Sequence, residues 1–121
     1  MILTDETLAR RLSELDEAMQ PIIKFLEDDS VLEIFLSPEG SIWVDEIGSG
    51  RRFSGVVMTP QDSERMIGLI AASLDIELNS RNPRLNTKLP HWGARVLAIM
   101  PPIVETPMFS LRKPSSKKWN G

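Results

Sequence analysis

Residues 31–46, VLEIFLSPEGSIWVDE, have the pattern of a β-hairpin. The two arms, 31–36 and 41–46, are rich in β-branched and aromatic residues, which favour strands. The SPEG sequence between the arms has proline in its second position and glycine in its fourth, as tight turns prefer. The stretch therefore predicts antiparallel β-structure in this part of the chain.

The segment before the hairpin predicts helical structure. Its apolar residues recur three and four positions apart, the spacing of one helix face; they are Leu8, Leu12, Leu15, Met19, Ile22 and Leu26. Proline is tolerated in the first turn of a helix but disrupts a helix interior. We therefore expect Pro21 to divide the segment into two helices, at about 5–20 and 21–28.

The segment after the hairpin predicts a third strand and then a helix. Residues 51–56, RRFSGV, follow a Gly-Ser-Gly turn and form the weaker strand of the three. Thr59 suits a helix N-cap and Pro60 suits the first helical position. An apolar face follows, so a helix is expected over about 60–74.

The last third of the chain predicts strands separated by turns. Residues 79–86 are polar and irregular, and the LPHWG sequence at 89–93 has the composition of a hairpin loop. Residues 94–100 predict a strand that is apolar on both faces and therefore central, and residues 108–113 predict a final strand. The element order predicts an α+β fold, with a mostly antiparallel sheet backed by helices on one side.

Composition describes one globular domain with an uneven charge. The chain has 121 residues, of which 26% are charged, and no cysteine. Disulfides and thiolate chemistry are therefore excluded. Residues 1–46 hold twelve acids and three bases, whereas residues 47–121 hold eleven bases and five acids. Such asymmetry indicates either an anion-binding half, or complementary faces in an assembly, or a dipolar surface without function.

The sequence offers few residues suited to catalysis. The sequence contains no G-x-x-x-x-G-K-[ST] phosphate loop and no G-x-S-x-G nucleophile elbow. The neighbouring acids Asp28-Asp29 and Asp45-Glu46 fit solvated charge better than a catalytic pair. His91 is the single histidine and lies in a Pro/Gly loop without an evident orienting partner. Neither a metal site nor a catalytic residue is expected here.

Two arginines stand out within apolar strands. Arg95 interrupts the strand at 94–100, and Arg112 follows Phe109 and Leu111 in the final strand. A buried or half-buried arginine needs a carboxylate or anion partner, because an unpaired buried charge is costly. A guanidinium fork also suits phosphate. The pattern alone leaves open whether the two arginines bind an anion or form structural ion pairs.

The hairpin and four downstream elements together resemble a known family. These elements are Leu89-Pro90, Gly93-Ala94-Arg95, Met100-Pro101-Pro102-Ile103-Val104 and Phe109-Ser110-Leu111-Arg112-Lys113-Pro114. Their order and spacing resemble the traffic ATPases of secretion and conjugation, and in particular the TrbB-like conjugal-transfer ATPases of type IV secretion systems. The likeness covers about residues 8–116, and the ordered set is more specific than any one piece.

The resemblance implies a fold and two site residues. Family members have a PAS-like N-terminal domain and a RecA-like ATPase domain, with nucleotide between the two. The corresponding division of this chain is an N-terminal helical segment at 1–30, a PAS-like α+β domain at 31–114 and a disordered basic tail at 115–121. By position, Arg95 and Arg112 match the arginines that the N-terminal domain lends to the nucleotide phosphates.

The sequence departs from the family by lacking the ATPase domain. ATP and magnesium would bind with that domain, so no cofactor is expected in this chain alone, and no ATP hydrolysis. The resemblance implies assembly with other ATPase subunits into a hexamer. It also implies partners in the inner-membrane secretion or conjugation machinery and a cytoplasmic location peripheral to that membrane.

The sequence is also compatible with two other classes of function. One is a free-standing PAS-like module that binds a ligand or nucleic acid through its basic half. Direct sequence-specific nucleic-acid binding is disfavoured, because the isoelectric point is about 5.2 and few aromatic residues are available for base stacking. The other is a small enzyme, which would have to work without cysteine and with one histidine. No membrane-spanning segment is expected.

Overall fold

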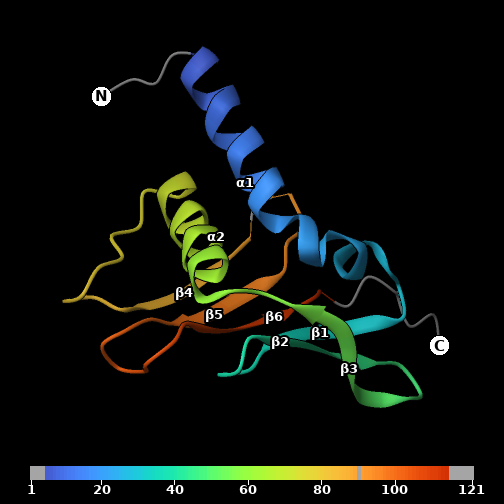
Figure 1. Ribbon diagram of the computed structural model, residues 1–121. Helices are drawn as coiled ribbons and strands as arrows, with labels where there is room; N and C mark the ends of the chain where they lie inside the picture. Colours follow the sequence, from blue (N-terminus) through green and yellow to red (C-terminus); the bar gives the residue numbers. More distant parts are fainter. Residues whose placement is uncertain (1–4, 90, 115–121) are drawn as a thin grey trace.

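The computed structural model describes residues 5–89 and 91–114 (Figure 1). It contains two helices and six strands. In chain order these are α1 (Asp5–Glu27), β1 (Val31–Leu36), β2 (Ser41–Glu46), β3 (Gly50–Val57), α2 (Pro60–Ser73), β4 (Arg84–Lys88), β5 (Arg95–Ile99) and β6 (Met108–Arg112). The expected tail at 115–121 lies outside the described residues, and so does Pro90 in the expected hairpin loop.

All six strands form one antiparallel sheet in the order β3-β2-β1-β6-β5-β4. The first and last strands of the chain, β1 and β6, therefore lie side by side at its centre. Figure 1 shows both helices on one side of the sheet, and no described element covers the opposite side. This arrangement confirms the α+β prediction of an antiparallel sheet backed by helices on one face. We call the uncovered side the open face.

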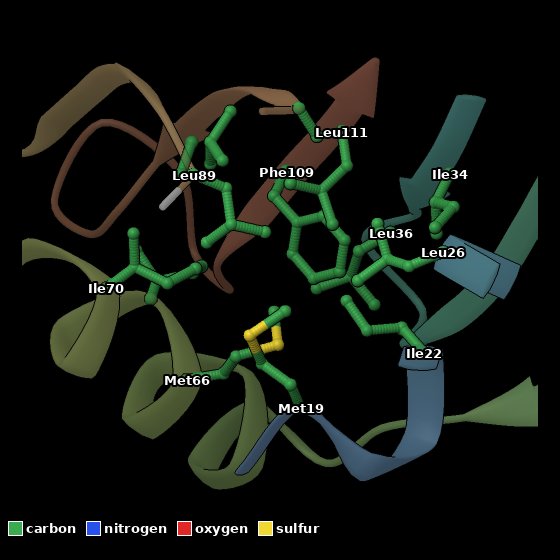
Figure 2. Packing of buried hydrophobic residues seen from close by; sticks show 14 of the residues in the cluster. Met19, Ile22, Leu26, Ile34, Leu36, Met66, Ile70, Leu89, Phe109 and Leu111 are labelled. Atoms are coloured by element: carbon green, nitrogen blue, oxygen red, sulfur yellow. The ribbon is translucent and has the colours of Figure 1, made fainter. Parts of the chain in front are cut away.

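The hydrophobic core lies between the sheet and the two helices. Figure 2 shows Met19 and Ile22 of α1 and Met66 and Ile70 of α2 pointing toward the strands, with Phe109 of β6 between them. All of these side chains are buried. Removing such side chains from water is the main source of stability in a domain of this size.

Helix α1 differs from the prediction, because it is one helix with Pro21 inside it rather than two. Proline removes one backbone hydrogen bond but does not prevent the helix from continuing with a bend. The buried side chains of Ile22, Phe25 and Leu26 come directly after the proline. Their packing against the core keeps the last turns helical despite the lost hydrogen bond.

The end of α1 is fixed by a residue from the far end of the chain. Lys113, which follows β6, donates its ammonium hydrogens to the backbone carbonyls of Phe25 and Asp28. The two carbonyls also accept backbone hydrogen bonds, from the N–H groups of Asp28 and Val31 respectively, and a cation interacts favourably with a helix C-terminus. Partial burial lowers the pKa of Lys113. The contact ties the helix to the strand that carries Arg112.

Helix α2 follows its prediction closely. The Thr59 hydroxyl accepts a hydrogen bond of 3.0 Å from the backbone N–H of Asp62, and Pro60 is the first helical residue. The helix ends at Ser73, one residue before the expected limit. An N-cap hydroxyl of this kind satisfies one of the unpaired amides of the first turn.

Strands β4 and β5 differ from the expectation for the last third. Strand β4 begins within the segment that was expected to be irregular. In β5, Val96 and Ala98 are buried whereas Arg95 and Leu97 are exposed, so the strand alternates instead of being apolar on both faces. It is an interior strand of the sheet, but only one of its faces is covered, because both helices lie on that side.

We expect Gly40→Ala to destabilise the fold more than Gly48→Ala. Both glycines have a positive φ, at 88° and 80°, which costs any other residue about 1 kcal/mol. At Gly40 an added Cβ would also lie 2.5 Å from the carbonyl oxygen of Met58, whereas at Gly48 it would meet nothing within 4 Å. Urea denaturation should show a loss of about 3 kcal/mol for Gly40→Ala. Equal losses for the two variants would contradict this account of the turn.

We expect Glu46→Gln to reduce the loss of unfolding free energy that occurs as the pH falls from neutral to acid. Arg52 donates two hydrogen bonds to the Glu46 carboxylate, at 2.6 and 3.2 Å, and holds its pKa below the ordinary value of 4.5. A depressed folded-state pKa stabilises the fold above the unfolded pKa, and this contribution is lost as the pH falls through the folded-state pKa. Denaturation at pH 7 and pH 3 should therefore show a smaller difference for Glu46→Gln than for the wild type. An unchanged difference would show that the pair is not linked to folding.

Candidate functional site

The structure brings Arg95 and Arg112 together on the open face. Arg95 opens β5 and Arg112 closes β6, and the two residues are direct partners in the antiparallel pairing of these strands. Directly opposed residues on neighbouring strands have their Cβ atoms about 5 Å apart and point to the same side of the sheet. Both side chains are exposed rather than buried. The two arginines singled out in the sequence therefore form one cationic pair.

The pair belongs to a line of charged residues that crosses the whole sheet. Strand pairing aligns, in order, Lys88, Arg95, Arg112, Glu33, Asp45 and Arg51, one from each strand from β4 to β3. We call this line the charged row. Its first three members are cations, the next two are half-buried carboxylates and the last is a cation. The positive charge is thus concentrated at one end of the row.

Neither arginine forms an ion pair among the described residues, although Glu33 is the strand partner of Arg112 on the side away from Arg95. Among the residues described, ion pairs join only Arg52 to Glu46 and Arg65 to Glu17. Arg95 donates one hydrogen bond of 3.0 Å to the side-chain oxygen of Asn86, a neutral acceptor. The structural ion-pair alternative raised by the sequence is therefore not observed for Arg95 or Arg112. Both side chains are exposed on the open face.

An apolar groove lies beside the charged row. Its cavity volume is about 550 Å³, and its apolar lining on the open face is provided by Phe35, Trp43, Leu97, Ile99 and Met108. Several of these residues follow or precede members of the charged row by two positions on the same strands, which places them about 7 Å away along the strand direction. The open face therefore combines an apolar hollow with a border of charged residues that is cationic at the β4–β6 end.

Arg51 is engaged differently from the other cations of the row. Its guanidinium carbon lies 4.1 Å from the centre of the Phe35 ring, a cation–π contact at the wall of the groove. Trp43 and Phe53 contact each other nearby, with ring centres 5.8 Å apart. Arg51 is thus held by the aromatic wall, and the three cations at the other end of the row are the ones available to an anion.

The other titratable residues considered in the sequence do not form a reactive centre. His91 is exposed, has a φ of 71° and makes a T-shaped ring contact with Trp92. Asp28 accepts hydrogen bonds from the hydroxyl and backbone N–H of Ser30, which lower its pKa. In the described ranges, no three His, Cys, Asp or Glu residues come together as a metal site would require.

None of the described helices is long and apolar enough to cross a membrane.

Sequence reasoning found the two arginines but missed Lys88, Arg51 and the groove. Arg95 and Arg112 were visible because each interrupts an apolar strand. Lys88 lies in a polar segment that gave no strand signal, and its place in the charged row depends on the pairing of β4 with β5. One signal could have indicated the strand. In Arg84–Lys88, Leu85 and the β-branched Thr87 alternate with Arg84, Asn86 and Lys88, which is the period of a half-buried strand.

The fold matches part of a type IV secretion ATPase. The crystal structure of the VirB11 ATPase from the Brucella suis type IV secretion system, in complex with sulphate, superposes with a TM-score of 0.81. The match covers 94% of this chain and 34% of that one, at 22% identity, so it establishes similarity of fold. No family model matches the sequence.

Sequence comparison finds relatives among the conjugal transfer proteins. The chain is 36% identical over 92 residues to the conjugal transfer protein TrbB of Rhizobium radiobacter. It is 31% identical over 109 residues to a probable TrbB of Sinorhizobium fredii. The chain is therefore homologous to the TrbB conjugal transfer proteins. It spans about a third of the length of these relatives, 28% of the first and 33% of the second.

We expect Arg95→Gln to stabilise the isolated chain at low salt. Like charges opposed across two strands are destabilising, by an amount within about 0.2–1 kcal/mol. Arg95 is opposed by Lys88 on one side and by Arg112 on the other. Urea denaturation should show a gain of a few tenths of a kcal/mol that shrinks as salt screens the charges.

Arg84→Gln is the matched control for this measurement. Arg84 is also an exposed arginine on the open face, but its strand partner is Ile99. We expect no comparable gain in that variant. If Arg95→Gln is destabilising at every salt concentration, the repulsion between the opposed cations is not what limits stability at this position.

Proposed function

We propose that this chain is the N-terminal, nucleotide-contacting part of a conjugal transfer ATPase of the type IV secretion class. In this proposal Arg95 and Arg112 bind the nucleotide phosphates. Homology to TrbB over most of the chain and the fold shared with VirB11 support the assignment to this class. The opposed arginine pair on the open face supports the role in phosphate binding.

The single observation that carries the proposal is the pairing of two exposed arginines without a carboxylate between them. Such an arrangement costs stability in the absence of an anion. A bound phosphate would offset that cost, because each guanidinium can donate two parallel hydrogen bonds to phosphate oxygens. The arrangement is therefore better suited to hold an anion than to stabilise the sheet.

The residues described here fit the phosphates of ATP better than they fit magnesium. Three neighbouring cations are complementary to a phosphate chain. Magnesium prefers oxygen ligands in an octahedral arrangement, and the described residues do not gather acidic groups in that way. Phosphoryl transfer depends on a positioned metal ion and nucleophile. We therefore propose that the chain on its own binds nucleotide without hydrolysing it.

The cellular role follows from the same proposal. The relatives are about three times as long as this chain, so the remaining part of such a protein would provide the phosphate loop and the metal ligands. We propose hexameric assembly with other ATPase subunits on the cytoplasmic side of the inner membrane. There the assembly would be peripheral to the membrane and would contact the conjugation or secretion machinery.

Nucleotide titration of the purified chain tests the proposal. We expect NMR shift changes on ATP addition to centre on β5 and β6, and the Arg95→Gln, Arg112→Gln double variant to weaken binding at least tenfold. A hydrogen bond to a charged group contributes about 1.5–3 kcal/mol, and tenfold in affinity corresponds to about 1.4 kcal/mol. Arg51→Gln is the matched control, because Arg51 lies in the same row but packs on Phe35.

Two results would contradict the proposal. One is the absence of shift changes at β5 and β6 at millimolar ATP. The other is equal weakening by the double variant and by Arg51→Gln, which would indicate general charge attraction and not a site. Release of phosphate from ATP by the purified chain, lost in the double variant, would overturn the expectation that the chain does not hydrolyse ATP.

A further inference from the structure

We propose that Lys88 is a third phosphate ligand and that the site is built for a linear polyphosphate chain, not for a single phosphate. The inference rests on the proposed function and adds the class of anion that the site selects. It depends on strand β4, which brings a third cation into line with the arginine pair. The ligand chemistry is shared by inorganic tripolyphosphate and by nucleoside triphosphates.

Strand pairing sets the spacing of the three cations. Lys88 is the partner of Arg95 across β4 and β5, and Arg95 is the partner of Arg112 across β5 and β6. Neighbouring strands are about 4.8 Å apart, so the three residues are spread over about 10 Å on one face. Spread over this length, the three side chains can each contact a different phosphate group of a chain that lies across the strands.

A side chain of β4 orients the central cation. The amide oxygen of Asn86 accepts a hydrogen bond of 3.0 Å from Nη1 of Arg95. Asn86 precedes Lys88 by two positions and lies on the same face of the strand. This contact directs the Arg95 guanidinium toward β4, the side on which Lys88 lies, and leaves its other donors free. Strand β4 therefore provides both an anchor for Arg95 and the third cation.

The ends of the cationic run are sharply defined. Beyond Arg112, the next residue in the charged row is the half-buried carboxylate of Glu33, which repels an anion. Beyond Lys88 the sheet ends, because β4 is an edge strand. The run is thus three cations long, and an anionic ligand is confined to the part of the open face above β4, β5 and β6.

Lys88 is free to act in this way. Its side chain is exposed, and no carboxylate of the described residues forms an ion pair with it. Strand β4, of sequence RLNTK, contains no acid that could neutralise it. A lysine placed opposite an arginine also opposes folding through repulsion. An anion that contacts both cations would relieve this repulsion, and the relief would add to the free energy of binding.

The test compares anions of increasing length in matched variants. We would measure dissociation constants of orthophosphate, pyrophosphate, tripolyphosphate and ATP at constant ionic strength for the wild type and for Lys88→Met. We expect Lys88→Met to weaken tripolyphosphate and ATP about fivefold to tenfold and to leave orthophosphate within twofold. Lys88→Arg should retain the affinity for tripolyphosphate.

Arg84→Met is the matched control in the same strand. Arg84 is exposed on the same face of β4, but it faces Ile99 and lies outside the charged row. This variant removes the same charge as Lys88→Met, so it should leave all four affinities within twofold. Equal weakening by the two variants would overturn the inference, because the effect would then be one of net charge.

The remaining outcomes separate the inference from the proposed function. If Arg95→Gln weakens tripolyphosphate and Lys88→Met does not, the inference is wrong and the arginine pair still stands as the phosphate site. If neither variant changes the affinity of any anion, both proposals are wrong. If ATP binds more tightly than tripolyphosphate and Lys88→Met weakens both, the inference is supported and the ligand is a nucleoside triphosphate. If ATP and tripolyphosphate bind equally tightly and Lys88→Met weakens both, the inference is also supported. The site then recognises the phosphate chain and not the nucleoside.

Discussion

The pairing of β1 with β6 is the contact on which the rest of the structure depends. The first three strands follow one another in half of the sheet, and the last three follow one another in the other half. Four residue pairs from Glu33–Arg112 to Leu36–Phe109 join the halves. The same contact buries Ile34 and Leu111 on the helix side of the sheet and aligns the charged row on the other face. One strand register therefore places the apolar residues in the core and the charged row on the open face.

That register also explains why the site opposes stability. In β5 and β6, each residue that packs into the core alternates with one on the open face, so Val96 and Leu111 are buried where Arg95 and Arg112 are exposed. A shift of either strand by one residue would exchange the two sets. Burial of the apolar set thus forces the cations into opposition, and the hydrophobic core provides the free energy that holds them there.

Sequence patterns predicted the individual helices and strands well, and the side-by-side order of the strands in the sheet poorly. The hairpin at 31–46 and helix α2 carry their own turn and capping signals, so neighbouring residues suffice to define them. The position of Lys88 beside Arg95 depends on pairing between separate strands, which a single sequence does not encode in its spacing. Pro21 was misjudged for a similar reason. The packing that keeps α1 helical beyond it comes from distant parts of the chain.

Both edges of the sheet carry cations, and this has a consequence for contacts between copies of the chain. Strand β3 presents Arg51 and Arg52, and strand β4 presents Arg84 and Lys88. Edge strands have unpaired backbone groups that can pair with another edge, and charged side chains are a common protection against such pairing. At the β4 edge the described residues form no ion pair with either cation, whereas at the β3 edge Arg52 is paired with Glu46. The charged side chains at both edges disfavour extension of the sheet from one molecule into the next.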